Sequence, residues 1–188
     1  MRKIILLVHV SLDGFVAGPN GEMDWIKLDD EMFDFVNTIT EHSDTALYGR
    51  ATYQLMDSYW PNAGKQPNAT KHDKEHSLWY NTVLKLVMSR TMGETPLTNT
   101  KIIGENFAEE LDKIKNAPGK NILMLGSPTA GHALTNKHLI DEYWIFLNPV
   151  LIGKGIPLFK NVNHLIHLKF SGSKNYACGV TALHYEKG

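Results

Sequence analysis

The chain has 188 residues, 43% of them hydrophobic, and a formal net charge of -1 from 19 basic and 20 acidic side chains. This balance gives no positive field for nucleic acid, no apolar stretch approaches the ~20 residues that span a membrane, and the single cysteine excludes a disulfide framework. We therefore expect one cytoplasmic domain over residues 1–188, with neither nucleic acid nor a membrane as partner.

Short apolar runs alternate with amphipathic stretches over the first two-thirds of the chain. Apolar or β-branched runs predict buried strands, and apolar residues three or four positions apart predict helices that pack on a sheet. The predicted elements, in chain order, are a strand at 4–10, a helix from Asp29 or Asp30 to 39, a strand at 45–48, a helix from about 51, strands at 83–88 and 101–103, a helix at 108–115, a strand at 121–125, a helix at 130–135, and strands at 141–147, 165–170 and 180–185. This order predicts a layered α/β fold whose sheet is parallel at first and gains antiparallel strands at its C-terminal end.

Two long segments fall outside this alternation. Turn-forming residues crowd positions 13–21, which predicts a mobile loop that continues to Trp25. Residues 57–82 are polar and rich in Asn, Lys and His, which predicts a long excursion from the sheet with room for one helix.

Three predicted strands stop at residues suited to binding an anion. Gly49-Arg50 combines close backbone approach, the N–H donors of a helix start and a guanidinium. Ser89-Arg90 and the turn at 126–129 end two other strands, and ligands of open α/β sheets bind beyond such carboxyl ends. The three segments could therefore hold one ligand with several phosphates, such as NADP. Alternatively, the three segments could be an exposed strand end and plain helix caps. No G-x-G-x-x-G motif follows the first strand, so the Rossmann fingerprint for dinucleotide binding is absent.

The segments 11–18, 49–53, 89–90 and 126–127, together with Trp25, resemble the dihydrofolate reductase superfamily. Within it, segments 139–142, 148–155 and 157–159 resemble the reductase domain of the bifunctional riboflavin-biosynthesis deaminase and reductase, and its stand-alone relatives. The resemblance implies a dihydrofolate-reductase-like three-layer αβα fold with a mixed, mostly parallel central sheet. It also implies an NADPH-dependent reductase that transfers hydride to a small pyrimidine-like or pterin-like heterocycle, as a 5-amino-6-(5-phosphoribosylamino)uracil reductase does in riboflavin biosynthesis.

Carried over position by position, the resemblance also implies which residues bind NADPH. They are Val16, Ala17 and Gly18 in a loop that closes over nicotinamide, Gly49, Arg50, Ala51 and Thr52 at the phosphates, Ser89 and Arg90 near the 2′-phosphate, and Gly126, Ser127, Pro128 and Thr129 under the pyrophosphate.

The proton donor is ambiguous. Folate reductases use a carboxylate on the first helix, and counting forward from Trp25 places it at Asp30, whereas counting back from Gly49 lands on Phe33, which cannot transfer a proton. Asp30 could simply favour the positive end of the helix, and Asp13, beside the expected cleft, could be catalytic or a turn former. Departures at this helix, at 57–82 and at the Gly-Lys-Gly segment argue against the alternative of a true dihydrofolate reductase.

A different class of protein remains open on sequence alone. His72 and His76 match the H-x-x-E-H pattern of zinc enzymes, although their polar surroundings favour a solvated helix, and we expect no metal. The chain could thus bind a nucleotide or zinc without any reductase turnover. His9 could face a ligand near nicotinamide or be a hydrogen-bonded core residue.

The C-terminal strands predict a homodimer. They offer more sheet edge and more apolar surface than one small sheet readily covers.

Overall fold

The computed structural model describes residues 1–93 and 98–188. Eight strands form one sheet in the order β5-β4-β3-β6-β1-β7-β10-β9, and β2 and β8 form a separate short ribbon. Neighbours from β5 to β7 run parallel, while β10 is antiparallel to both β7 and β9. The strands are β1 (Ile4–Ser11), β2 (Phe15–Ala17), β3 (Ser43–Gly49), β4 (Leu84–Met88), β5 (Thr100–Ile103), β6 (Asn121–Leu125), β7 (Glu142–Asn148), β8 (Ile156–Pro157), β9 (Leu168–Asn175) and β10 (Thr181–Lys187).

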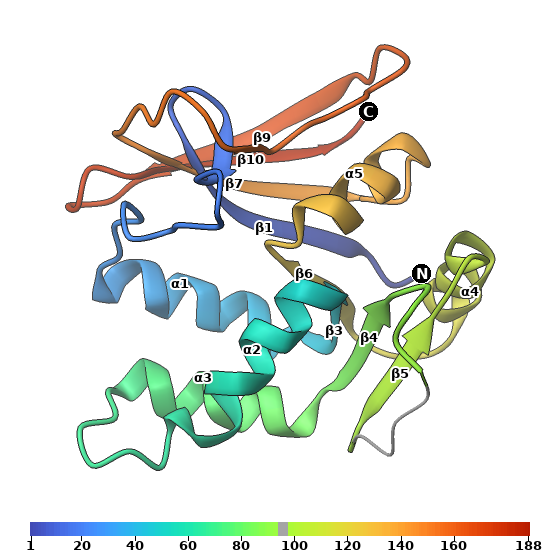
Figure 1. The fold of residues 1–188 in the computed structure, drawn as a ribbon, viewed down its shortest axis with the longest axis horizontal. Helices are drawn as coiled ribbons and strands as arrows, with labels where there is room; N and C mark the ends of the chain where they lie inside the picture. The colour runs from blue at the N-terminus through green and yellow to red at the C-terminus, as the bar shows by residue number, and fades with distance from the viewer. Residues whose placement is uncertain (94–97) are drawn as a thin grey trace.

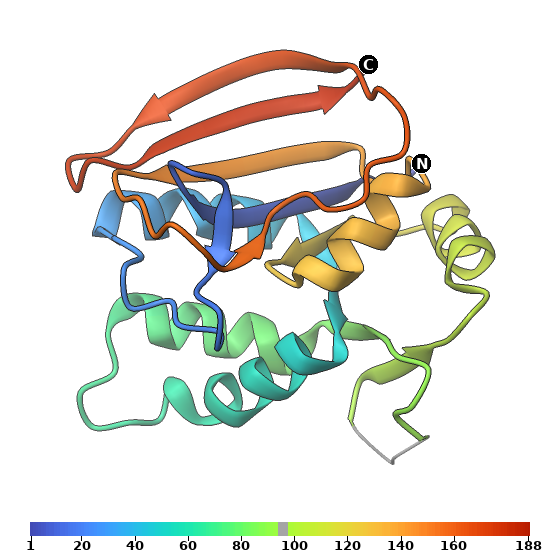
Figure 2. The ribbon, with the colours of Figure 1, turned by 45° about the horizontal axis from the view of Figure 1, so that its top comes forward.

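Helices cover both faces of the sheet (Figures 1 and 2). Side chains of α1 (Asp30–Glu41), α2 (Arg50–Ala63) and α3 (Lys71–Thr82) share one buried cluster with Ile5 and Leu7 of β1. Side chains of α4 (Phe107–Asn116) and α5 (Pro128–Asn136) share another with Ile4 and Leu6. Because successive strand residues point to opposite faces, β1 is buried on both. This confirms the three-layer αβα fold and the mostly parallel sheet.

The excursion expected at 57–82 holds one complete helix, as predicted, but it also holds the end of α2, which was not expected. α2 continues to Ala63, and α3 occupies most of the remaining segment after a capping box of Thr70 with Asp73. The pattern was hidden because the inner face of α3 buries a histidine and a serine beside Tyr80, so few apolar residues mark it. The segment 57–82 therefore contains the end of α2 and the whole of α3.

Two other expectations about local structure are correct only in part. Part of the predicted mobile loop forms β2, which pairs with β8. The strand expected at 165–170 is β9, which begins at Leu168 and continues through polar residues to Asn175, because an edge strand needs no apolar face.

In the part of the chain that the structure describes, the helices are too short or too polar to cross a lipid bilayer.

Candidate functional site

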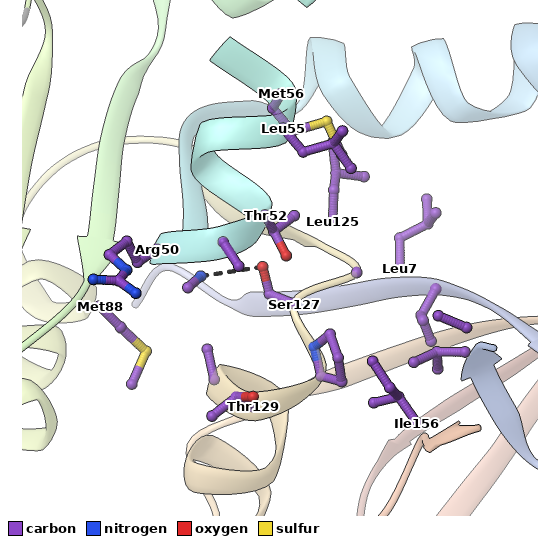
Figure 3. A pocket seen from close by; sticks show the side chains of 18 of the residues that line it. Leu7, Arg50, Thr52, Leu55, Met56, Met88, Leu125, Ser127, Thr129 and Ile156 are labelled. Atoms are coloured by element: carbon purple, nitrogen blue, oxygen red, sulfur yellow. Dashed lines mark hydrogen bonds between the residues drawn. The ribbon is translucent and has the colours of Figure 1, made fainter. Parts of the chain in front are cut away.

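A cavity of about 1160 Å³ opens where the parallel strands end. Its walls come from the carboxyl ends of β1, β3, β4 and β6, from the first three helices and from the ribbon of β2 and β8 (Figure 3). This is the place where open α/β sheets bind ligands.

The three segments predicted to bind phosphate all lie on this cavity. Its lining includes Val16, Ala17, Gly49, Arg50, Ala51, Thr52, Ser89, Arg90, Gly126, Ser127, Pro128 and Thr129, but not Gly18. A hydrogen bond joins two of the segments, since the Gly49 N–H donates to Ser127 Oγ at 3.1 Å (Figure 3).

The starts of α2 and α5 face each other across this hydrogen bond. Gly49 has no side chain with which to cap α2, and the Ser127 hydroxyl does not cap α5. Neither N-cap side chain therefore accepts a hydrogen bond from the N–H groups in the first turn of its helix, and such groups attract anions. Two helix starts at one point form a site suited to a pyrophosphate.

The turn before α5 has an uncommon backbone. Gly126 and Ser127 both adopt positive φ, at 59° and 60°. Glycine accepts this conformation freely, whereas for serine it is strained. Because Ser127 is also buried, its hydroxyl is held beside Gly49 rather than free to turn toward solvent.

Two guanidinium groups lie at one end of the cavity. Arg50 is exposed, and its Nη1 donates to Thr91 Oγ1 at 3.0 Å. Arg90 lines the same end and has no ion-pair partner among the described residues. Ser89 Oγ accepts the Met92 N–H at 2.9 Å, which shapes the turn and leaves the hydroxyl proton available. This end is suited to a further phosphate group.

The ribbon of β2 and β8 forms one lip of the cavity. Val16, Ala17 and Ile156 line it, whereas Gly18 is buried behind the lip. A Cβ at Gly155 would lie 2.1 Å from the Ala17 carbonyl oxygen, so only glycine allows the two segments to approach this closely. The Gly-Lys-Gly segment thus shapes the lip.

The structure places neither predicted catalytic carboxylate on the cavity. Asp13 is exposed and accepts hydrogen bonds from Ser11 Oγ at 2.6 Å and the Gly153 N–H at 2.7 Å. The Ser11 hydroxyl, with the Gly153 and Ile152 N–H groups, lowers the pKa of Asp13 below its ordinary value. This carboxylate therefore ties two loops together.

Asp30 is the exposed first residue of α1 and does not line the cavity. Its neighbour Asp29 is the N-cap and accepts the Met32 N–H at 2.9 Å, which lowers the pKa of Asp29. Phe33, by contrast, lines the cavity. Of the two residues that the counts reached, only Phe33 therefore lies on the cavity.

His9 lines the cavity and is also hydrogen-bonded, so its position is compatible with both sequence interpretations. Its Nδ1 lies 3.3 Å from Asn148 Nδ2, and its ring stacks on Phe146. Burial lowers the pKa of His9 to about 4, so the ring is neutral at neutral pH. The sequence signal was a single polar residue inside an apolar strand.

His72 and His76 are not on a solvated helix, which corrects that prediction. Both line the cavity, and His76 is only 4% exposed. Burial lowers the pKa of His72, and it lowers that of His76 to about 3. Among the described residues, they do not gather with a third ligand as a metal site would require.

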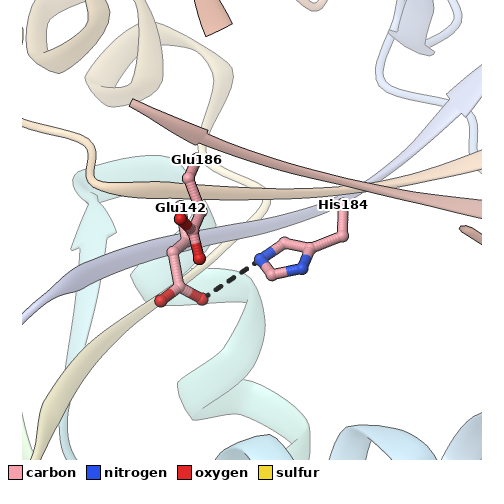
Figure 4. A group of neighbouring side chains, drawn as sticks. All are labelled: Glu142, His184 and Glu186. Carbon is pink, nitrogen blue, oxygen red and sulfur yellow. Dashed lines mark ion pairs between the residues drawn. The ribbon is translucent and has the colours of Figure 1, made fainter. Parts of the chain in front are cut away.

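One other group of side chains has the composition of a metal site. Glu142, His184 and Glu186 bring their ligand atoms within 4.8 Å of one another on β7 and β10 (Figure 4). However, Lys3 Nζ already donates to Glu142 Oε1 at 2.5 Å, and His184 Nε2 lies 3.3 Å from the other oxygen. With a lysine in place, the group is an ion-pair network, and none of its members lines the cavity.

Known proteins resemble the chain over nearly its whole length. Residues 2–182 match the family model described as the RibD C-terminal domain. The uncharacterized protein YyaP of Bacillus subtilis is 38% identical over 98% of this chain and 94% of its own length. These matches confirm the family resemblance expected from the sequence.

Solved structures confirm the fold. A protein described as acting in riboflavin biosynthesis, from Shewanella sp. PV-4, superposes with a TM-score of 0.74 at 23% identity, covering 100% of this chain and 99% of its own. A dihydrofolate reductase from Enterococcus faecalis, in complex with NADP(H), superposes with a TM-score of 0.68 at 11% identity, covering 99% and 96%.

Proposed function

The chain belongs to the RibD C-terminal domain family, and from this membership we propose that it is an NADPH-dependent reductase that transfers hydride to a small heterocycle. One observation carries the proposal. The uncapped starts of α2 and α5 meet at the Gly49–Ser127 hydrogen bond, at the ends of β3 and β6, inside one cavity. That arrangement supports a pyrophosphate site.

The charged end of the cavity supports NADPH over NADH. Arg50 and Arg90, with the Ser89 hydroxyl, offer donors for the 2′-phosphate, which NADH lacks. The nicotinamide would then lie toward Leu7 and His9 of β1. When bound, the cofactor supplies the hydride.

The chain's own residues would orient the reactants and exclude water. Apolar side chains of β1, α1 and α2 line most of the central cavity, and the lip at Val16 and Ala17 adjoins them. Among the described lining residues, Glu105 is the sole carboxylate, and it follows β5 near the arginines. Phe33, which the count back from Gly49 reaches, lines the cavity and cannot transfer a proton, and this supports the family reaction rather than a true dihydrofolate reductase.

Cofactor titration tests the proposal. Binding of each cofactor is measured by nicotinamide fluorescence. We expect NADPH to bind at least tenfold more tightly than NADH, because a charge-assisted hydrogen bond to the 2′-phosphate contributes ~1.5–3 kcal/mol. Arg50→Gln should weaken NADPH binding about tenfold and leave NADH binding unchanged. Lys65→Gln, on an exposed residue away from the cavity, is the matched control.

Each outcome of this titration has a distinct meaning. Failure to bind either cofactor would refute the reductase proposal. Equal binding of NADPH and NADH would remove only the 2′-phosphate role of Arg50, Ser89 and Arg90. Binding without NADPH oxidation in the presence of any heterocycle would favour the alternative of a nucleotide-binding protein.

A further inference from the structure

The two ends of the cavity differ in charge. Arg50 and Arg90 lie at the end beyond β3 and β4. At the other end, under α1, α2 and α3, no lysine or arginine lines the cavity among the residues that the structure describes. A phosphate group there would have no permanent cation to neutralise it.

Aromatic rings form the wall of this second end. Phe33 of α1 stacks on His72 of α3, with ring centroids 3.9 Å apart and planes at 15°. Trp60 of α2 meets the same imidazole edge-on at 5.5 Å and packs on His76 at 4.1 Å. Three helices thus present flat rings to one space, which favours a planar guest.

The imidazoles in this wall are neutral. Burial lowers the pKa of both His72 and His76, so neither carries a positive charge at neutral pH. His72 Nδ1 and both ring nitrogens of His76 are buried without a hydrogen-bond partner among the described residues. The wall therefore offers polar atoms without offering charge.

His9 offers a defined donor on the same face of the sheet. Alternate residues of β1 share a face, so His9 points with Ile5 and Leu7 toward the three helices. The Lys27 N–H donates to Asn148 Oδ1 at 2.9 Å, which fixes the amide and turns its Nδ2 toward His9 Nδ1. Nδ1 must then accept, so the proton of neutral His9 resides on Nε2.

We propose that this end of the cavity is the substrate site and that it takes a planar, uncharged heteroaromatic compound without a phosphate group, to which His9 Nε2 donates a hydrogen bond. The inference rests on the proposed reductase function, because it assumes that the charged end holds the cofactor. It departs from the phosphoribosyl pyrimidine that the family resemblance implies, since that compound would place its phosphate against Phe33, Trp60 or neutral imidazoles.

Calorimetric titration with a matched pair of compounds tests the substrate class. The protein is saturated with NADP⁺, which has no hydride to transfer, so binding is measured without turnover. The ligands are 5-amino-6-(5-phosphoribosylamino)uracil, the same compound without its phosphate, and lumazine. We expect at least one phosphate-free compound to bind tenfold or more tightly than the phosphorylated one. Tighter or equal binding of the phosphorylated compound, or no binding of any of the three, would overturn the proposal.

Two pairs of variants locate the bound ring. Trp60→Leu should weaken heterocycle binding about tenfold, whereas Trp25→Leu, on a tryptophan that does not line the cavity, should not. His9→Leu removes the donor and should also weaken binding about tenfold, while His9→Gln, which keeps an amide donor, should restore it to within about threefold. Equal loss in both His9 variants would overturn the donor role.

Failure of this inference can be separated from failure of the proposed function. If the protein does not bind NADP⁺ or NADPH, the reductase proposal fails first. If it binds cofactor normally but prefers the phosphorylated compound, only the substrate class assigned to the aromatic end is wrong.

Discussion

His76 is an uncharged imidazole enclosed between α2 and α3. It is 4% exposed, and neither ring nitrogen has a hydrogen-bond partner among the described residues. Burial lowers the pKa of His76 from 6.5 to about 3. Acid must therefore either charge this ring inside the protein or unfold the surrounding helices.

The stability of the protein should fall in acid for this reason. Between pH 6.5 and pH 3 the unfolded chain binds the proton and the native chain does not, so the free energy of unfolding rises with pH in that window. At pH 5, one such histidine lowers stability by about 2 kcal/mol relative to pH 7.5. In His76→Gln that part of the loss should disappear.

Urea unfolding at pH 7.5 and pH 5 measures the difference. His9 has a lowered pKa as well, so the variant should keep part of the pH dependence. His42→Gln, on an exposed histidine, serves as the control and should behave like the natural chain. An unchanged pH dependence in His76→Gln would mean that His76 titrates freely in the native state.

The residues that could be predicted from the sequence are those at the carboxyl ends of strands, where open α/β sheets bind ligands. Glycine, serine and arginine after buried strands pointed to Gly49, Arg50 and Ser127, and these residues line one cavity. Phe33 was not assigned to the wall. Which face of α1 looks into the cavity depends on how α1 packs against α3, and no local pattern contains that information.

At the scale of elements, two adjacent carboxylates at the start of α1 have different surroundings. Asp29 accepts the Met32 N–H and also the Cys178 N–H at 3.2 Å, so it joins α1 to the turn before β10. Asp30, one position later, is exposed and outside the cavity. Asp29 should thus contribute more than Asp30 to the free energy of unfolding.

Substitution of each carboxylate by alanine tests this difference. Asp29→Ala should lower the free energy of unfolding by about 1–2 kcal/mol, because the cap is lost, while Asp29→Asn should retain most of it. Asp30→Ala should leave the free energy of unfolding unchanged. It should also change the rate of NADPH oxidation with the best heterocycle by no more than about twofold. A large loss of turnover in Asp30→Ala, with stability intact, would restore Asp30 as the proton donor.

Element prediction succeeded where one face of an element is apolar and failed where it is not. β1 and β6 are mostly apolar, and their bounds were expected within one or two residues. α3 buries His76 and Ser77 in place of apolar residues, and β9 lies at an edge with its polar residues exposed. In both elements, tertiary neighbours rather than residue pattern decide the structure.

At the scale of the whole molecule, the strand order brings together residues that are far apart in sequence. The parallel sheet and its antiparallel C-terminal strands follow from how strands and helices alternate. The order itself, with β6 between β3 and β1, does not follow from that alternation. It is this order that brings Gly49 next to Ser127, whereas the strand ends alone predicted only that the two segments could share one ligand.

The C-terminal edge of the sheet leads to a prediction about assembly. Among the described residues, β9 has one sheet neighbour, β10. Phe170 on β9 is 57% exposed and packs edge-on against Tyr185. An edge strand with an exposed aromatic ring is suited to a second copy of the chain. We therefore expect a homodimer that buries β9.

Light scattering at micromolar concentration tests this assembly. The natural chain should have the mass of a dimer, and Phe170→Glu should have that of a monomer, because a charge on the contact face opposes burial. Leu78→Glu, which changes an exposed leucine on α3, is the matched control and should stay dimeric. A monomeric natural chain would contradict the prediction, and a dimer that survives Phe170→Glu would place the contact on another surface.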